Sequence, residues 1–332
     1  MHTPLLPSIQ TRLAGRKGFT LVELLVALSV VAVLVVTMIS ILSSESMLTT
    51  QSRKQLAADS EARMIFDRMT ADFAGMVKRP DVDFIFGRPT GNDALFFYSE
   101  APALADAASA YPNTCALVGY RVNSSNQLER LGKGLTWGAA PPDGPTFLTY
   151  STTSVPLSPD ANSTFANPAW STLVGTAPAY NNGTSTTYYH VLGDAVFRLE
   201  FCFLLKPLKQ TDGSVLPAIY SNLPYDTRPN QLISPVPSSL YGLGPTDIQA
   251  IVVTMAILDL NSRKIVSAAN LQTLAGDLLD PTDSDLAATP PKLMAETWDA
   301  ALTNGTLTGV LKQAATNVHI YQRTFYLGPF LN

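Results

Sequence analysis

Residues 24–42 form an unbroken uncharged segment, and a different, alternating pattern of apolar and polar residues follows it. Nineteen residues in helical geometry span roughly 28 Å, close to the hydrocarbon thickness of a bilayer. Farther along, apolar residues recur every three or four positions among charged ones, which predicts an amphipathic helix that packs on a globular head. We interpret this apolar stripe as core rather than as a cofactor site; it comprises Ala62, Ile65, Phe66, Met69, Phe73 and Met76.

No helix breaker interrupts this region. Proline is absent between Pro7 and Pro80, and glycine is absent between Gly18 and Gly75, so one helix is expected over residues 19–74. The sequence therefore divides into four segments: a leader at 1–18, a transmembrane and assembly helix at 19–43, an amphipathic continuation at 44–79, and a head at 80–332.

The head is expected to be rich in β-structure. Six segments combine β-branched and aromatic residues; they are Asp93–Ser99, Cys115–Val122, Gln127–Leu131, Ala195–Leu205, Ile248–Leu258 and Val318–Leu327. Asn123 to Asn126 form a turn cluster that predicts an antiparallel hairpin. Helices are expected near Pro291–Leu302 and Thr308–Ala315. The fold class predicted is α+β: a long N-terminal transmembrane helix packed on an antiparallel-sheet head with long loops.

Two stretches of the head are expected to be loop-rich insertions. Residues 134–193 carry only Asp143 and Asp160 as charges among many small polar residues, and residues 206–245 are rich in proline. Such compositions favour surface loops. No internal repeat is present, and one elaborated head is expected, with two lobes as the alternative.

Charge separates the leader from the rest of the chain. The chain holds 22 Lys and Arg against 26 Asp and Glu. Arg12, Arg16 and Lys17 lie in a leader without acids, so the remaining residues carry a net charge of −7. An acidic head is repelled by phosphate, so no nucleic-acid partner is expected. The basic leader predicts a cytoplasmic N-terminus and an extracytoplasmic head.

Glu23 is the residue in the apolar segment that needs an explanation. An ionised carboxylate inside a membrane costs on the order of 3 kcal/mol unless it is paired. Cleavage between Gly18 and Phe19 would create an α-ammonium group one helical turn away, on the same chain or on a neighbouring copy. The plainer alternative is an ordinary signal anchor with Glu23 at the headgroup boundary.

The residues GRKGFTLVELLVAL resemble the prepilin leader and methylation motif of type IV pilins and type II secretion pseudopilins. The resemblance implies a prepilin peptidase of the inner membrane that cuts after Gly18 and methylates Phe19. It also implies that Glu23 aids docking into a helical filament. Major pilins often carry a proline in the apolar half; this chain has none there, which points to a minor subunit.

The order of the head's elements is similar to that of the J-type minor pseudopilins and the PilW-like minor pilins. That order is a helix ending in DRMTADF, the hairpin VGYRVNSSNQLERL, then FRLEFCF and AIVVTMAIL. The blocks ALFFYSE, FRLEFCFLLK and VVTMAILDLNSRK also resemble the Verru_Chthon cassette protein C family. That family brings no established biochemical activity.

The sequence gives little support for a catalytic site or a metal site. His2 lies in the leader, and His190 and His319 are far apart and fit no zinc-ligand spacing. No nucleophile elbow, phosphate loop or nucleotide fingerprint is present, so the chain is not expected to be an enzyme.

Calcium is the one cation with a candidate site. Pseudopilins use calcium loops, which makes the acidic segment GDLLDPTDSD the candidate, with Asp277, Asp280, Asp283 and Asp285. Its spacing fits no EF-hand. The alternative is a solvated turn with helix-capping aspartates.

Cys115 and Cys202 both lie in expected strands of an extracytoplasmic head. An oxidising compartment favours a disulfide between them, and two separate buried thiols are the alternative.

Two functional hypotheses follow. The first is a minor pilin or pseudopilin subunit of a type IV pilus or type II secretion-like filament, single-pass in the inner membrane and close to the filament tip, with other pilin-like subunits as partners. The second is a monomeric, membrane-anchored binding module or adhesin. The two differ in whether Glu23 finds a partner on another subunit.

Overall fold

The computed structural model describes residues 20–78, 84–88, 91–101, 115–134, 188–209, 215–226, 245–304 and 317–328. The chain divides into two compact units, Met1–Arg53 and Lys54–Asn332. We call the second unit the head. The expectation of one head and the four segment boundaries drawn from the sequence remain predictions.

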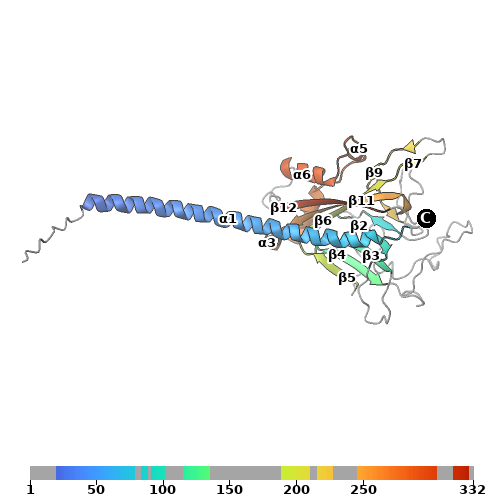
Figure 1. Ribbon diagram of the computed structural model, residues 1–332, viewed down its shortest axis with the longest axis horizontal. Helices are drawn as coiled ribbons and strands as arrows, with labels where there is room; N and C mark the ends of the chain where they lie inside the picture. The colour runs from blue at the N-terminus through green and yellow to red at the C-terminus, as the bar shows by residue number, and fades with distance from the viewer. Residues whose placement is uncertain are drawn as a thin grey trace, which may run out of the picture. The chain divides into compact units, whose positions relative to one another are not determined.

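The longest element is helix α1, Leu21–Ala74, which contributes its first part to the N-terminal unit and its last part to the head (Figure 1). It ends at Ala74, where the sequence predicts the end of the unbroken helix, because Gly75 comes close to the chain at Ser99. A Cβ on Gly75 would lie 2.9 Å from the Ser99 hydroxyl, and the Gly75 carbonyl accepts a hydrogen bond from the Glu100 amide at 2.8 Å. Glycine permits this close approach, and the chain turns there into the head.

Two antiparallel sheets make up most of the described head (Figure 1). One has six strands in the order β10-β1-β2-β3-β4-β5; they are β1 (Ile85–Gly87), β2 (Ala94–Ser99), β3 (Ala116–Val122), β4 (Leu128–Gly134), β5 (Tyr189–Gly193) and β10 (Tyr225–Asp226). The other has four strands in the order β12-β11-β6-β9; they are β6 (Val196–Leu205), β9 (Tyr220–Ser221), β11 (Ile248–Leu258) and β12 (Val318–Tyr326).

Short elements complete the described head. A two-stranded ribbon joins β7 (Leu208–Lys209) to β8 (Val215–Leu216). The helical segments are η3 (Pro245–Asp247), α3 (Leu260–Ile265), α4 (Ala268–Asp277), α5 (Asp283–Leu286) and α6 (Met294–Asn304). The fold class predicted from the sequence, α+β with antiparallel sheets, is confirmed.

All six strands expected from β-branched and aromatic runs are present, with bounds shifted by up to three residues. The hairpin between β3 and β4 is also present. Asn123 accepts amide hydrogen bonds from Ser125 and Gln127 on its side chain at 2.9 and 3.0 Å, and Asn126 has a positive φ of 55°. Asparagine tolerates this left-handed conformation, which explains the turn.

The loop expectation was wrong for parts of the two insertions. Strand β5 lies in the stretch expected to be loop at 134–193, and the four short strands β7 to β10 lie in 206–245. Helix α6 begins three residues after the expected Pro291, and the helix expected at Thr308–Ala315 lies outside the described residues.

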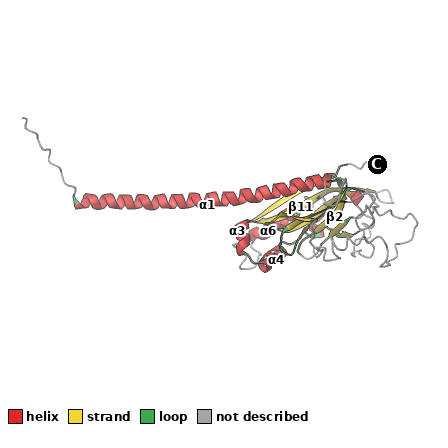
Figure 2. Ribbon diagram, turned by 90° about the horizontal axis from the view of Figure 1, so that it is seen from below, coloured by secondary structure: helices red, strands yellow, loops and turns green. Residues whose placement is uncertain are grey.

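The described head buries apolar side chains in three clusters. The largest lies between the last part of α1 and the inner faces of both sheets. A second covers the outer face of the four-stranded sheet with α4, α5 and α6, so that β11 is buried on both faces. Figure 2 shows α1 on one side of β11, and α4 and α6 on the other. The third lies on the six-stranded sheet.

Candidate functional site

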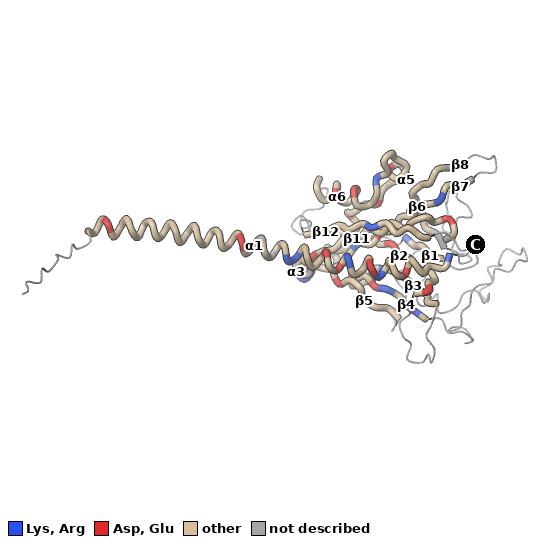
Figure 3. The backbone as a smooth tube through the Cα atoms, viewed as in Figure 1, with Lys and Arg blue, Asp and Glu red and all other residues tan. Residues whose placement is uncertain are grey.

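The N-terminal part of α1 is long and apolar enough, by length and composition, to cross a membrane. Its large apolar side chains from Leu21 to Leu42 are exposed, each by 48% or more. Between Glu23 and Glu45 the helix carries no charged residue, as the tan run of the tube between two red positions in Figure 3 shows. A surface of this size is stable only when lipid or other apolar helices cover it.

Polar side chains in this segment bond to their own helix. The hydroxyl groups of Ser29 and Thr37 donate to the carbonyls of Val26 and Leu34, each at 2.8 Å. These bonds leave the hydroxyl protons satisfied without water. The apolar run is therefore compatible with a lipid environment despite its serine and threonine residues.

A capping box closes the N-terminus of α1. The Thr20 amide and hydroxyl both donate to Oε2 of Glu23, at 2.9 and 3.0 Å, and the Glu23 amide donates to the Thr20 hydroxyl at 3.3 Å. This reciprocal arrangement satisfies two backbone donors of the first turn. The carboxylate also lies at the positive end of the helix dipole. Within one chain, Glu23 therefore already has polar partners, which the sequence argument did not foresee.

The other two residues of the predicted processing site, Gly18 and Phe19, lie outside the described residues. Cleavage and methylation at this junction therefore stay predictions.

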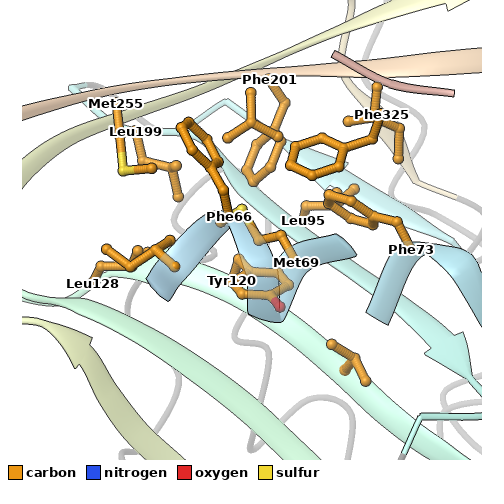
Figure 4. Packing of buried hydrophobic residues seen from close by; sticks show 14 of the residues in the cluster. Phe66, Met69, Phe73, Leu95, Tyr120, Leu128, Leu199, Phe201, Met255 and Phe325 are labelled. Carbon is orange, nitrogen blue, oxygen red and sulfur yellow. The ribbon is translucent and has the colours of Figure 1, made fainter. Parts of the chain in front are cut away.

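Within the head, the last part of α1 packs on the two sheets through the predicted apolar stripe. All six residues of the stripe are buried. Figure 4 shows Phe66, Met69 and Phe73 directed toward side chains from both sheets. Ring centroids of Phe73 and Phe325 lie 5.1 Å apart, and those of Phe73 and Phe97 lie 5.4 Å apart. The helix thus contacts β12 of one sheet and β2 of the other, and the prediction of a core role is confirmed.

A buried polar network fixes α1 to the six-stranded sheet. Asp72 is fully buried and accepts two hydrogen bonds from Arg130 on β4, at 2.6 and 2.8 Å. Tyr120 on β3 donates to the same carboxylate, and Arg68, one helical turn earlier, lies 3.3 Å from it. Burial and the neighbouring Asp72 carboxylate hold the pKa of Tyr120 well above its usual range, so it remains a donor. The sequence contained a signal for this site: an acid among the residues of the apolar stripe, two residues before the helix ends.

The expected disulfide is not formed. Cys115 and Cys202 are both free and buried in the structure. Cys115 packs in the cluster on the six-stranded sheet, whereas Cys202 packs in the cluster beneath α4 and α6. The two thiols therefore belong to different layers of the head. The structure agrees with the alternative expectation, two separate buried thiols.

The acidic segment expected to be the best calcium candidate has other structural roles. Asp280 pairs with Arg88 and with Arg198, the latter at 2.8 Å. Asp285 forms a capping box with Thr282 at the start of α5. Asp283 and Asp277 lie at the first turn of α5 and the end of α4. In the part of the chain that the structure describes, no three His, Cys, Asp or Glu side chains are grouped to hold a metal ion.

The structure does not place the described histidine side chains close to each other. His190 lies exposed on β5 of the six-stranded sheet, and His319 lies half-buried on β12 of the other sheet. His2 lies outside the described residues.

Comparison with known proteins agrees with the N-terminal features. Residues 13–39 match the family described as the prokaryotic N-terminal methylation motif. The chain is also 31% identical over 128 residues to type II secretion system protein J of Klebsiella pneumoniae, a match that covers 34% of this chain. The chain spans 60% of the length of that relative.

Among solved structures, a type IV-like pilin from Thermus thermophilus aligns with 82% of this chain and 96% of its own, at 10% identity and a TM-score of 0.29. A TM-score this low bears on neither fold nor function. The chain therefore carries the N-terminal methylation motif, which overlaps the apolar start of α1, and is similar to protein J over part of its length.

Proposed function

We propose that this protein is a minor pseudopilin-like structural subunit rather than an enzyme. In this proposal, prepilin peptidase cuts after Gly18 and methylates the new N-terminus at Phe19. The apolar part of α1 then anchors the subunit in the inner membrane and assembles with the helices of other pilin-like subunits. The basic leader favours a cytoplasmic N-terminus and a periplasmic head.

The observation that carries the proposal is the match to the methylation motif at residues 13–39, which overlaps the start of α1, where Glu23 is the one acid of an otherwise uncharged apolar run. A simple membrane anchor has no need of a carboxylate at this depth, because a charged group there is costly. A filament subunit has a use for it, since the ammonium group of a neighbouring subunit is a matching partner.

The second candidate is a solitary membrane-anchored module, and one observation favours it. The hydrogen bonds from Thr20 satisfy Glu23 without any other chain. On that proposal the acid serves only to start the helix, and no subunit partner is required.

The experiment that tests processing is mass spectrometry of full-length protein extracted from membranes, with and without a co-expressed prepilin peptidase. The expected N-terminus is Phe19 carrying one methyl group, and only when the peptidase is present. Protein that retains residues 1–18 in peptidase-expressing cells would contradict both processing and the pseudopilin proposal.

Orientation has its own test. Protease added to spheroplasts is expected to digest the head and to leave the apolar segment of α1 in the membrane. A head protected from protease until the membrane is dissolved would reverse the proposed topology.

A further inference from the structure

Strand β6 has an open edge, because another strand pairs with only a short part of it. Side chains from elsewhere in the head bind its backbone nearby. It pairs with β11 on one edge, whereas β9 covers only two residues of the other edge. Nearer the start of β6, Oδ1 of Asn92 accepts the Leu199 amide and Oδ2 of Asp93 accepts the Phe201 amide, each at 2.8 Å. The Asp93 amide donates to the Leu199 carbonyl at 2.9 Å. Because Asn92 and Asp93 directly precede β2, these bonds join the two sheets.

Four charged groups from three segments of the chain surround the Asp93 carboxylate. Arg88, after β1, lies 3.6 Å from Asp93. Arg198 and Glu200 project from β6 and lie 3.0 Å from each other. Asp280, from the segment between α4 and α5, pairs with both arginines. If all were ionised, three carboxylates would face two guanidinium groups, and Asp93 and Glu200 are the two buried carboxylates of the three.

Of these three carboxyl groups, Glu200 is the one that the geometry indicates to be protonated and neutral. Its Oε1 atom is paired with Arg198, but its Oε2 atom is buried and meets no hydrogen-bond donor among the described residues. An ionised oxygen without a donor is costly in the core, whereas a protonated Glu200 can itself donate a hydrogen bond to the Asp93 carboxylate beside it. On the neighbouring strand β11, the residue in register with Glu200 is the uncharged Thr254. Cys202, on β6 near Asp93, is a neutral thiol because burial raises its pKa to about 12.

The electrostatic environment agrees with this geometry. Burial and the adjacent Asp93 carboxylate raise the pKa of Glu200 well above its ordinary value of 4.5. Burial likewise raises the pKa of Asp93, to about 6, although Glu200 and Arg88 oppose the shift. At neutral pH, one proton on Glu200 beside an ionised Asp93 is therefore the stable arrangement.

We propose that Glu200 is a proton-holding latch: as a neutral acid it keeps Asn92 and Asp93 on the open edge of β6, and loss of its proton loosens the joint between the two sheets. The folded head binds this proton more tightly than the unfolded chain does. The latch is therefore fully effective at acid pH, and its contribution is lost as the pH rises toward the folded pKa of Glu200. Well above pH 6, where Asp93 is ionised, the loss comes from Glu200.

Denaturant unfolding of the full-length protein in detergent between pH 6 and pH 9 tests the latch, with fluorescence of the buried Trp298 among the signals. The variants are Glu200→Gln, a neutral isostere, and Glu296→Gln, which changes an exposed glutamate on α6. We expect the unfolding constant of the wild type, relative to that of Glu200→Gln, to rise with pH by up to about tenfold per unit. The Glu296→Gln protein should follow the wild type. Parallel pH profiles for wild type and Glu200→Gln would overturn the proposal.

A second measurement does not depend on the stability of any variant. The wild-type protein at pH 7.5 should show the infrared carbonyl band of a protonated carboxylic acid. That band should be lost in Glu200→Gln and retained in Glu296→Gln. A wild-type spectrum without the band, or a band undiminished in Glu200→Gln, would refute the latch.

Discussion

Arg130 on β4 donates two parallel hydrogen bonds to Asp72 on α1, from Nε to Oδ2 at 2.6 Å and from Nη2 to Oδ1 at 2.8 Å. Both side chains are buried. A bidentate pair fixes direction as well as distance, so it sets the rotation of the last turns of α1 against the six-stranded sheet.

Replacing Asp72 by Asn should therefore destabilise the head strongly. The change leaves the Arg130 guanidinium buried without its counter-charge, which typically costs about 3–5 kcal/mol. Denaturant unfolding of the full-length protein in detergent measures the loss.

The matched control is Asp67→Asn on the same helix, because Asp67 pairs with Arg323 at the surface at 3.2 Å. Surface pairs contribute about 0–1 kcal/mol. Equal losses for the two variants would show that the buried pair has no special role.

Gly119 should not tolerate a side chain. It lies opposite Phe96 in the register of β2 and β3, and a Cβ there would come within 2.1 Å of the Phe96 ring. Gly119→Ala should cost about 1–3 kcal/mol, because the ring would have to leave a packed position. Gly276→Ala on α4 is the control, since no atom lies within 4 Å of its added Cβ. Alanine favours the helix, so the control should be neutral or stabilised by up to about 1 kcal/mol.

The two cysteines should behave as slow, free thiols. Burial raises the pKa of Cys115 to about 11 and that of Cys202 to about 12, so little reactive thiolate is present at pH 8. Iodoacetamide should modify neither thiol rapidly in the native protein. After unfolding without reductant it should modify both. If the unfolded protein reacts only after reduction, the two cysteines form a disulfide and the prediction of free thiols is wrong.

Local pattern explains which parts of the fold the sequence revealed. The run Ile248–Leu258 is long and β-branched, and the apolar stripe of α1 repeats over four turns, so both were predictable. Strand β1 has three residues, and β5 lies in a stretch of small polar residues. Neither therefore shows the two-residue alternation of apolar and polar side chains that predicts a strand. Helix α4 could have been found from Ser267, which caps it by accepting the Asn270 amide at 3.2 Å.

The long-range polar sites were beyond sequence reasoning for a different reason. Asp93 and Phe201 are 108 positions apart, and Asp72 and Arg130 are 58 positions apart. Periodicity describes neighbours along the chain and does not say which loop meets which strand. The same limit left the pairing of the two cysteines open, because their positions in the sequence gave no information about the layers that separate Cys115 from Cys202.

Glu23 offers the sharpest test between a filament subunit and a solitary anchor. Two substitutions separate its charge from its role in the capping box. Glutamine at this position still accepts hydrogen bonds from Thr20 and keeps the box, but it cannot pair with an ammonium group. Alanine removes both functions. Each variant should still be cleaved and inserted, because the apolar segment and the basic leader are unchanged.

On the filament proposal, Glu23→Gln and Glu23→Ala should both weaken cross-linking from a probe at Val31 to other prepilin-like subunits, since both remove the charge. If the acid serves only to cap α1, Glu23→Gln should cross-link as the wild type does. Thr20→Val is the complementary variant: it removes the hydroxyl from the box but leaves the carboxylate, so the filament proposal expects its cross-linking to persist. Wild-type protein that forms no cross-links to such subunits would favour the solitary anchored module, because α1 would then have only lipid as its partner.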